Sequence, residues 1–422
     1  MNKWVRRILF SIVIMVMLFT LFLALTYFSV DNRVDLGERV SEFKNVKPIK
    51  RLDSIVIQPD SLTAYVASLM ERANVHGLAI SIINNHQLVY QGYFGSRNRQ
   101  KNETFTPGVI WYGASLSKTI FADIVLQLVE GKVLDLDTPL YKYLKNPLHT
   151  YKTNSIQRLF GANFIDYTDL EGDERYKKIT ARMCLAHTTG LPNWRWLESD
   201  QKLKIKFEPG ARYSYSGEGM FLLQFVLEEL TGQDFEDIAF EKVFKPHNMN
   251  RSSYIWQRGY EGNYAVGHDR NGSYLGIQKS NVSNAAGSLS TTLEEYTRYF
   301  LTVLEQKQSR YQELITPQIP IKSKQQFGPN ALIDTHENDA IWLSYGLGFG
   351  IYETPFGKVF FKEGHGDGWQ HYAVGFPQNG TALIIMSNSD NAESIFNELI
   401  EYTTGNIYTP WFWEGYIPYI YN

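Results

Sequence analysis

Apolar runs near the two ends of the chain predict strands, and longer segments with helical spacing lie between them. Residues 77–83 and 88–94 are strand-like and are joined by Asn84-Asn85-His86-Gln87, which predicts a β-hairpin. Four more short strands separated by turns are predicted late in the chain, at residues 347–352, 358–364, 372–376 and 382–387. The pattern indicates an α+β fold in which both ends of the chain build one antiparallel sheet.

Helical spacing of apolar residues predicts the elements that flank this sheet. The predicted helices cover residues 61–74, 120–129, 179–187, 221–230 and 392–402. We therefore expect one folded domain over residues 61–405, with a helical subdomain at about residues 115–270. The polar stretch 306–340 is either a lid or a surface loop, and the pattern does not choose between them.

The beginning of the chain has the pattern of a membrane anchor. Lys3, Arg6 and Arg7 precede an uncharged, mostly apolar run over residues 8–30. At ~1.5 Å per residue this run spans roughly 34 Å, which is enough to cross a bilayer. A cleaved signal peptide is the alternative, but its apolar region is usually shorter.

The positive residues before the run predict a cytoplasmic N-terminus. We therefore expect a single-pass membrane protein with a transmembrane anchor in residues 1–30 and a charged tether over residues 31–60. The folded domain is then extracytoplasmic, in the periplasm or at the cell surface.

Composition narrows the classes of function. The net charge is −3 at pH 7 and no basic stripe is present, so nucleic acid is not an expected partner. Cys184 is the only cysteine and the histidines lack metal-ligand spacing, so we expect no metal and no cofactor. The last residues, 406–422, form an aromatic tail, for which packing is favoured over membrane contact or carbohydrate stacking.

Ser115 is the candidate nucleophile. It follows the small residues Gly113 and Ala114 and opens a helix, where unpaired N–H groups and the helix dipole favour an oxyanion. Lys118, three residues on, shares a face with Ser115 and can accept its proton if the amine is neutral. An N-cap serine with a surface lysine is the alternative, because S-x-x-K also occurs at Ser199.

Several motifs in order resemble those of the serine β-lactamases and penicillin-binding proteins, specifically the class C β-lactamase-like branch with its D,D-peptidases and esterases. The motifs are Gly77-Leu78-Ala79-Ile80-Ser81-Ile82, Ser115-Leu116-Ser117-Lys118, His187-Thr188-Thr189-Gly190-Leu191-Pro192 and the run from Pro209 to Gly217. The resemblance covers about residues 61–402. It implies a β-lactamase/transpeptidase-like fold and makes Ser115 the nucleophile.

The resemblance also assigns roles around the nucleophile. Tyr215 takes the position of the family's catalytic tyrosine, and a phenol beside a lysine ammonium can be drawn toward phenolate and relay the proton of Ser115. Gly217 stands where the family has an asparagine. Glycine has no amide with which to hold a substrate or steady Lys118.

The family's third motif, usually K-T-G on a strand, has two registers in this chain. One is Lys362-Glu363-Gly364 and the other begins at His365. We favour Lys362, which lies inside the predicted strand. Lys362 then binds a substrate carboxylate, Gly364 admits the substrate backbone, and the N–H groups of His365 and Ser115 form the oxyanion hole.

These observations predict a membrane-anchored, extracytoplasmic serine hydrolase that acts on an amide or ester carbonyl through an acyl-enzyme. The expected substrates are small molecules or peptides: a peptidoglycan stem peptide, a β-lactam, a D-amino-acid peptide or a small ester. One alternative is a D,D-carboxypeptidase or penicillin-binding protein with slow β-lactam turnover. Another, motivated by Gly217, is a catalytically weak binding protein or envelope scaffold.

Overall fold

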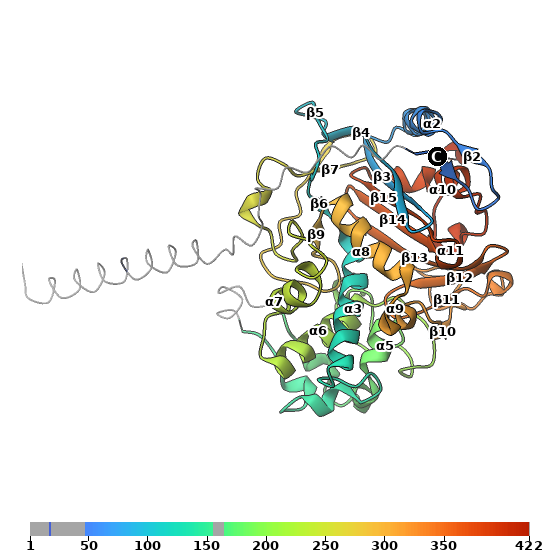
Figure 1. The fold of residues 1–422 in the computed structure, drawn as a ribbon. Helices are drawn as coiled ribbons and strands as arrows, with labels where there is room; N and C mark the ends of the chain where they lie inside the picture. The colour runs from blue at the N-terminus through green and yellow to red at the C-terminus, as the bar shows by residue number, and fades with distance from the viewer. Residues whose placement is uncertain (1–16, 18–46, 155–163, 422) are drawn as a thin grey trace, which may run out of the picture.

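The structure, a computed structural model, describes residue 17 and residues 47–154 and 164–421. Within these residues nine strands form one antiparallel sheet, to which both ends of the folded region contribute (Figure 1). In spatial order the strands are β10 (Ile319–Pro320), β11 (Ser344–Tyr345), β12 (Gly350–Thr354), β13 (Gly357–Gly366), β14 (Trp369–Phe376), β15 (Thr381–Ser387), β3 (Gly77–Asn84), β4 (Gln87–Asn98) and β5 (Glu103–Thr104).

Helices cover both faces of this sheet because its central strands are apolar on both sides. Along β15, Ile384 packs into the core under one set of helices, whereas Leu383 and Ile385 pack into the core on the opposite face. On the first face α8 (Leu293–Glu305) packs directly on β3 and β15, and the same core continues into a helical region (Figure 1) formed by α3 (Ser117–Glu130), α5 (Ala181–Leu185), α6 (Gly217–Thr231), α7 (Phe235–Ala239) and α9 (Ser309–Leu314). The second set comprises α2 (Pro59–Arg72), α10 (Phe396–Thr404) and α11 (Trp411–Glu414).

Three short two-stranded ladders complete the described strands. They are β1 (Ile49–Lys50) with β2 (Val56–Ile57), β6 (Trp111–Tyr112) with β9 (Ser290–Thr291), and β7 (Gly267–His268) with β8 (Tyr274–Gly276). The β6–β9 ladder matters most for function, since β6 leads directly into the turn that carries Ser115.

The predicted hairpin, the late meander and the predicted helices are confirmed, with ends shifted by a few residues. One predicted boundary is wrong. The sequence predicts a tether as far as residue 60, but β1 and β2 pair within it and Ile49 is fully buried against the sheet. Two apolar side chains in a charged stretch are too weak a signal to predict this contact.

The predicted anchor is not tested by the structure. Among the described residues, no helix has both the length and the apolar character needed to cross a bilayer. The predicted span over residues 8–30 lies, except for Met17, outside the described residues.

The aromatic tail packs on the folded domain. Trp413 is buried, and the ring of Trp411 lies 5.3 Å from the ring of Tyr372 on β14. The backbone N–H of Gln326 donates to the carbonyl of Trp413 at 2.9 Å. The tail therefore joins the stretch 306–340, at Gln326, to the face of the sheet.

Candidate active site

Ser115 lies in a strained turn at the start of α3. The turn Ala114–Leu116 is a 3₁₀ helix, and Ala114 has φ of +45°, which is uncommon for a residue with a Cβ atom. Two hydrogen bonds hold this geometry, from the N–H of Gly113 to the carbonyl of Leu289 at 2.7 Å and from the Ser117 hydroxyl to the carbonyl of Ala114 at 2.5 Å. The surrounding structure thus fixes where the Ser115 hydroxyl points.

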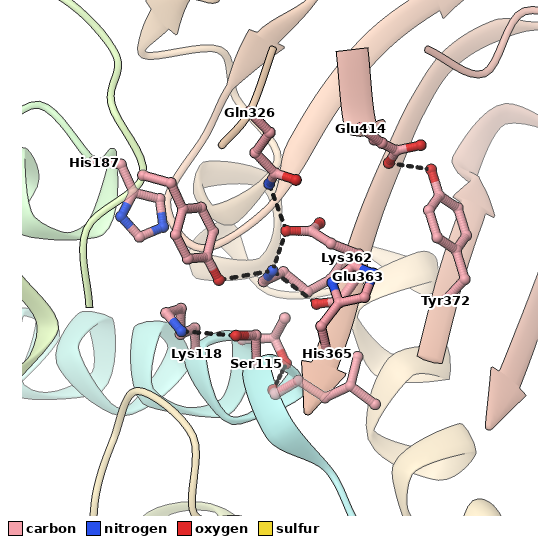
Figure 2. Close-up of polar contacts among 12 residues, drawn as sticks. Ser115, Lys118, His187, Gln326, Lys362, Glu363, His365, Tyr372 and Glu414 are labelled. Carbon is pink, nitrogen blue, oxygen red and sulfur yellow. Dashed lines mark hydrogen bonds and ion pairs between the residues drawn. The ribbon is translucent and has the colours of Figure 1, made fainter. Parts of the chain in front are cut away.

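Lys118 is placed to act as the base for Ser115. Its side chain is fully buried, and its Nζ lies 2.9 Å from Ser115 Oγ (Figure 2). Nζ also donates to the carbonyl oxygen of Ala286 at 2.5 Å. Burial, and then the positive charge of Lys362, lower the pKa of Lys118 well below its usual value. A neutral amine has a lone pair that can accept the hydroxyl proton, as the spacing of the two residues predicts.

Tyr215 lies between two lysines. Its ring centroid is 4.9 Å from Lys118 Nζ and 5.1 Å from Lys362 Nζ, and its hydroxyl accepts a hydrogen bond of 3.2 Å from Lys362. Burial raises the pKa of Tyr215 by more than Lys362 lowers it. Desolvation thus outweighs the attraction of Lys362 and favours the protonated phenol in the resting site, and the relay role of Tyr215 stays a prediction.

His187 holds the ring of Tyr215 in place. The sequence motif that contains His187 did not indicate this contact. Its ring centroid lies 4.2 Å from that of Tyr215, and its Nδ1 accepts a hydrogen bond from the N–H of Ser216 at 3.1 Å. Burial, followed by the charges of the two lysines, lowers the pKa of His187 well below its usual value. His187 is therefore a neutral packing partner of the tyrosine.

Lys362 reaches the site from β13, and its ammonium is already occupied. Besides Tyr215, Nζ donates to the carbonyl oxygen and to Oε1 of Glu363, each at 2.8 Å. Gln326 donates to the same Oε1 at 2.6 Å. Burial disfavours the charge of Lys362, but Glu363 and Tyr215 together outweigh burial and raise the pKa of Lys362. Lys362 in turn lowers the pKa of Glu363 despite burial.

The two registers of the third motif differ clearly in the structure. The ammonium of Lys362 lies beside Tyr215, whereas the imidazole Nε2 of His365 lies 2.9 Å from the hydroxyl of Tyr416 and 3.4 Å from Glu393. The structure thus brings Lys362 to the site and turns the ring of His365 toward the tail.

Gly364 lies where β13 meets the nucleophile turn. A Cβ atom on Gly364 would lie 3.0 Å from the carbonyl oxygen of Gly113, so a larger residue would crowd the nucleophile turn. The backbone N–H groups of Ser115 and His365 remain the predicted oxyanion hole.

Gly217 is covered by a residue that the sequence did not single out. A Cβ atom on Gly217 would lie 2.3 Å and 2.5 Å from two ring carbons of Trp194. The N–H of Gly217 donates to Oδ1 of Asn193 at 3.1 Å. The indole therefore fills the space beside Gly217, and its ring centroid lies 5.8 Å from Lys118 Nζ.

A buried ion pair fixes Trp194 in this position. Arg195, the next residue, binds Glu218 on the first turn of α6 through its side chain and its backbone N–H. The exposed fractions of the two side chains are 11% and 1%. Trp194 also stacks on Trp196, with ring centroids 4.8 Å apart.

The stretch 306–340 contributes to the site at one point. Gln326 bonds to Glu363, and the partly exposed ring of Phe327 lies 5.2 Å from the ring of Tyr215 in an edge-on contact. This part of the stretch is a wall of the site. Elsewhere the stretch forms α9 and β10, and residues 328–338 are irregular and mostly exposed, as the surface-loop alternative predicts.

His371 supports the nucleophile turn from β14. Its Nε2 lies 2.7 Å from the carbonyl oxygen of Tyr112, and its Nδ1 accepts from the N–H of Ser387 at 3.3 Å. Burial lowers the pKa of His371 to about 4, so the ring is neutral at pH 7. In the part of the chain that the structure describes, no group of three His, Cys, Asp or Glu side chains is arranged to hold a metal ion.

Comparison with known proteins agrees with this architecture. A family model described as beta-lactamase matches residues 62–402. The D-alanyl-D-alanine-carboxypeptidase/endopeptidase AmpH of Escherichia coli K12 is 22% identical over 363 residues, which cover 82% of this chain and 90% of that protein.

Two solved structures show the same fold. A D-alanine carboxypeptidase AmpC from Burkholderia cenocepacia aligns with a TM-score of 0.60 and 18% identity, covering 78% of this chain and 93% of that one. An octameric penicillin-binding protein homologue from Pyrococcus abyssi aligns with a TM-score of 0.61 and 21% identity, covering 79% of this chain and 74% of that one.

Proposed function

Because the chain belongs to the beta-lactamase family, we propose that it is a membrane-anchored, extracytoplasmic serine hydrolase that attacks an amide or ester carbonyl. One observation carries the proposal: the buried amine of Lys118, with its lowered pKa, lies 2.9 Å from Ser115 Oγ. A nucleophile and a base at hydrogen-bond distance are what acyl transfer requires.

The geometry supports the following reaction. Ser115 Oγ forms a bond to the carbonyl carbon while its proton passes to the neutral amine of Lys118. The bond to the leaving group then breaks, the leaving group takes the proton of the Tyr215 hydroxyl, and the proton held by Lys118 restores the phenol. Water then cleaves the acyl-enzyme, which returns the hydroxyl to Ser115 and releases the acid.

Hydrogen-bond donors around Ser115 stabilise the negative charge that develops in this reaction. The carbonyl oxygen becomes negative in the tetrahedral intermediate, and the N–H groups of Ser115 and His365 are the proposed donors to it. Lys362 keeps its ammonium within reach of the Tyr215 hydroxyl, so it stabilises the phenolate that forms transiently when the proton leaves.

The proposal includes an extracytoplasmic location. It rests on the apolar run at residues 8–30 and on the positive residues before it. Substrates that this location offers include peptidoglycan-derived peptides, β-lactams and small esters.

A D,D-carboxypeptidase with slow β-lactam turnover is the second candidate. The likeness to AmpH favours it, because that relative is described as a carboxypeptidase and the match covers most of both chains. A D,D-carboxypeptidase acts beside a terminal carboxylate. A preference for a substrate with a free carboxylate over its methyl ester would therefore favour this second candidate.

Covalent labelling tests the proposal. The full-length protein should gain one fluorophosphonate adduct, mapped to Ser115, and Ser115→Ala should lose it. Ser199→Ala is the matched control, because Ser199 has the same S-x-x-K spacing but lies on the exposed surface. Labelling that persists in Ser115→Ala, or that is lost in Ser199→Ala, would contradict the assignment.

A further inference from the structure

The ammonium of Lys362 has no hydrogen-bond donor left for a substrate. A lysine ammonium has three N–H donors. They go to the Tyr215 hydroxyl, to the carbonyl oxygen of Glu363 and to the carboxylate of Glu363. A substrate carboxylate could bind Lys362 only by displacing one of these partners.

The carboxylate of Glu363 is also built into the site. Its side chain is 1% exposed, and Gln326 holds the oxygen that bonds to Lys362. Its other oxygen, Oε2, is buried and has no hydrogen-bond partner among the described residues. A buried negative charge thus lies directly beside the ammonium of Lys362, which was expected to attract an anionic substrate.

The neighbouring titratable groups do not restore a positive charge. Lys118 has a pKa lowered by burial and by Lys362, which favours the neutral amine. Glu414, whose Oε1 accepts from the Tyr372 hydroxyl at 2.9 Å, has a pKa raised well above its usual value by burial and by Glu363. The charges of Lys362 and Glu363 therefore cancel, and the site is close to neutral.

We propose that Glu363 is a specificity-determining residue that makes this site select uncharged esters or amides over substrates with a carboxylate beside the scissile bond. The proposal rests on the hydrolase function proposed above and names its substrate class. It also modifies the role expected for Lys362, which becomes a partner of Tyr215 rather than a binding group for a substrate carboxylate.

A pair of esters that differ only in this charge tests the proposal. One is the phenylacetyl ester of 3-hydroxybenzoic acid, and the other is the same compound with its carboxyl group methylated. In the full-length wild type, kcat/KM should be about 10-fold or more higher for the methyl ester, because a carboxylate would lie beside Glu363 without a charge-assisted hydrogen bond in return.

Substitutions of Glu363 should change this preference. Glu363→Gln removes the charge at constant shape, and Glu363→Thr also frees a donor of Lys362. Each should raise kcat/KM for the acid relative to the methyl ester by about 10-fold. Glu414→Gln is the matched control: burial raises the pKa of this neighbouring carboxyl and favours its neutral form, so the isosteric amide should leave the charge, and therefore the ratio, unchanged.

The outcomes separate the two proposals. Turnover that depends on Ser115 and favours the acid in the wild type would overturn the role of Glu363 and leave the hydrolase standing. An unchanged ratio in correctly folded Glu363→Gln and Glu363→Thr would overturn it as well. If neither ester is turned over and Ser115 is not labelled, the hydrolase and the inference fail together. The ratio of kcat/KM for the methyl ester to that for the acid is measured on the wild type alone. The proposal can therefore be overturned even if both variants misfold.

Discussion

A single methyl group placed on Gly217 should destabilise the protein by displacing Trp194. The Cβ atom of Gly217→Ala would lie 2.3 Å from a ring carbon of Trp194, whereas ordinary carbon contacts are about 3.5–4.0 Å. The indole must therefore move by about 1.2–1.7 Å to reach an ordinary contact distance. It is held by its stacking on Trp196 and by its contact with Phe221 at 5.3 Å, and each such aromatic pair is worth about 0.5–1.5 kcal/mol.

We expect Gly217→Ala to lower the free energy of unfolding by about 1–3 kcal/mol, as overpacking of a filled site usually does. In a Trp194→Ala background the same substitution should cost less, because only the backbone carbonyl oxygen of Asn193, 2.8 Å from the added Cβ atom, still stands in its way. Gly217 opens α6 without a positive φ, and alanine is the better helix former by about 0.5–1 kcal/mol, which offsets part of this remaining cost. The destabilisation should thus be smaller without the indole than with it.

A double-mutant cycle measures this coupling. Urea unfolding of the four proteins, followed by circular dichroism, should give an interaction energy of about 1–3 kcal/mol between positions 217 and 194. If Gly217→Ala costs the same with and without the indole, Trp194 does not fill this space and the reasoning is refuted.

The cycle also has a catalytic readout. The sequence suggests that Gly217→Asn shifts preference toward amide substrates by supplying an amide side chain. With Trp194 present there is no room for that side chain, so we expect the shift only in the Trp194→Ala background. The measurement is kcat/KM for a chromogenic cephalosporin and for a p-nitrophenyl ester on each variant.

Three further predictions concern the catalytic groups and the anchor. The kcat/KM of an ester should rise with pH as Lys118 loses its proton, with a midpoint well below the usual lysine pKa. Lys362→Met removes a like charge, so it should raise the pKa of Lys118 and move this midpoint to higher pH. A midpoint that stays unchanged or moves to lower pH would contradict the assignment of Lys118 as the base. Tyr215→Phe should lower kcat by about 10²–10⁴-fold in protein that still folds, and a loss under 10-fold would remove the tyrosine from proton transfer. Full-length protein should sediment with membranes and resist high-salt extraction, whereas a fragment starting at Asp31 should not; a mature N-terminus found between residues 23 and 35 would show cleavage instead.

The sequence predicted those parts of the site that depend on local spacing. Ser115 and Lys118 are three residues apart at the start of a helix, so helical geometry alone brings them together. The strands were predictable for a similar reason, because apolar runs bounded by turns are a local signal.

Contacts between distant segments were not predictable in this way. Nothing near Gly217 in the sequence indicates that the ring of Trp194 lies against it, since Arg195 and Glu218 set that contact from different segments. Glu363 follows Lys362 directly, but its effect depends on its burial and on Gln326, which no pattern reveals. The same applies to Tyr215, whose pKa is decided by the extent of desolvation.

The order of the strands has a consequence for how the protein is made. β3 pairs with β15, and in their register Ile80 lies opposite Ile385, about 300 residues later in the chain. At ~5–20 residues per second, a ribosome needs roughly 15–60 s to supply that partner. Until then the hairpin of β3 and β4 has an open, apolar edge, which is the kind of surface that pairs with other chains. Folding of the sheet must therefore wait for nearly the whole chain, and the nascent protein depends on whatever shields that edge in the meantime.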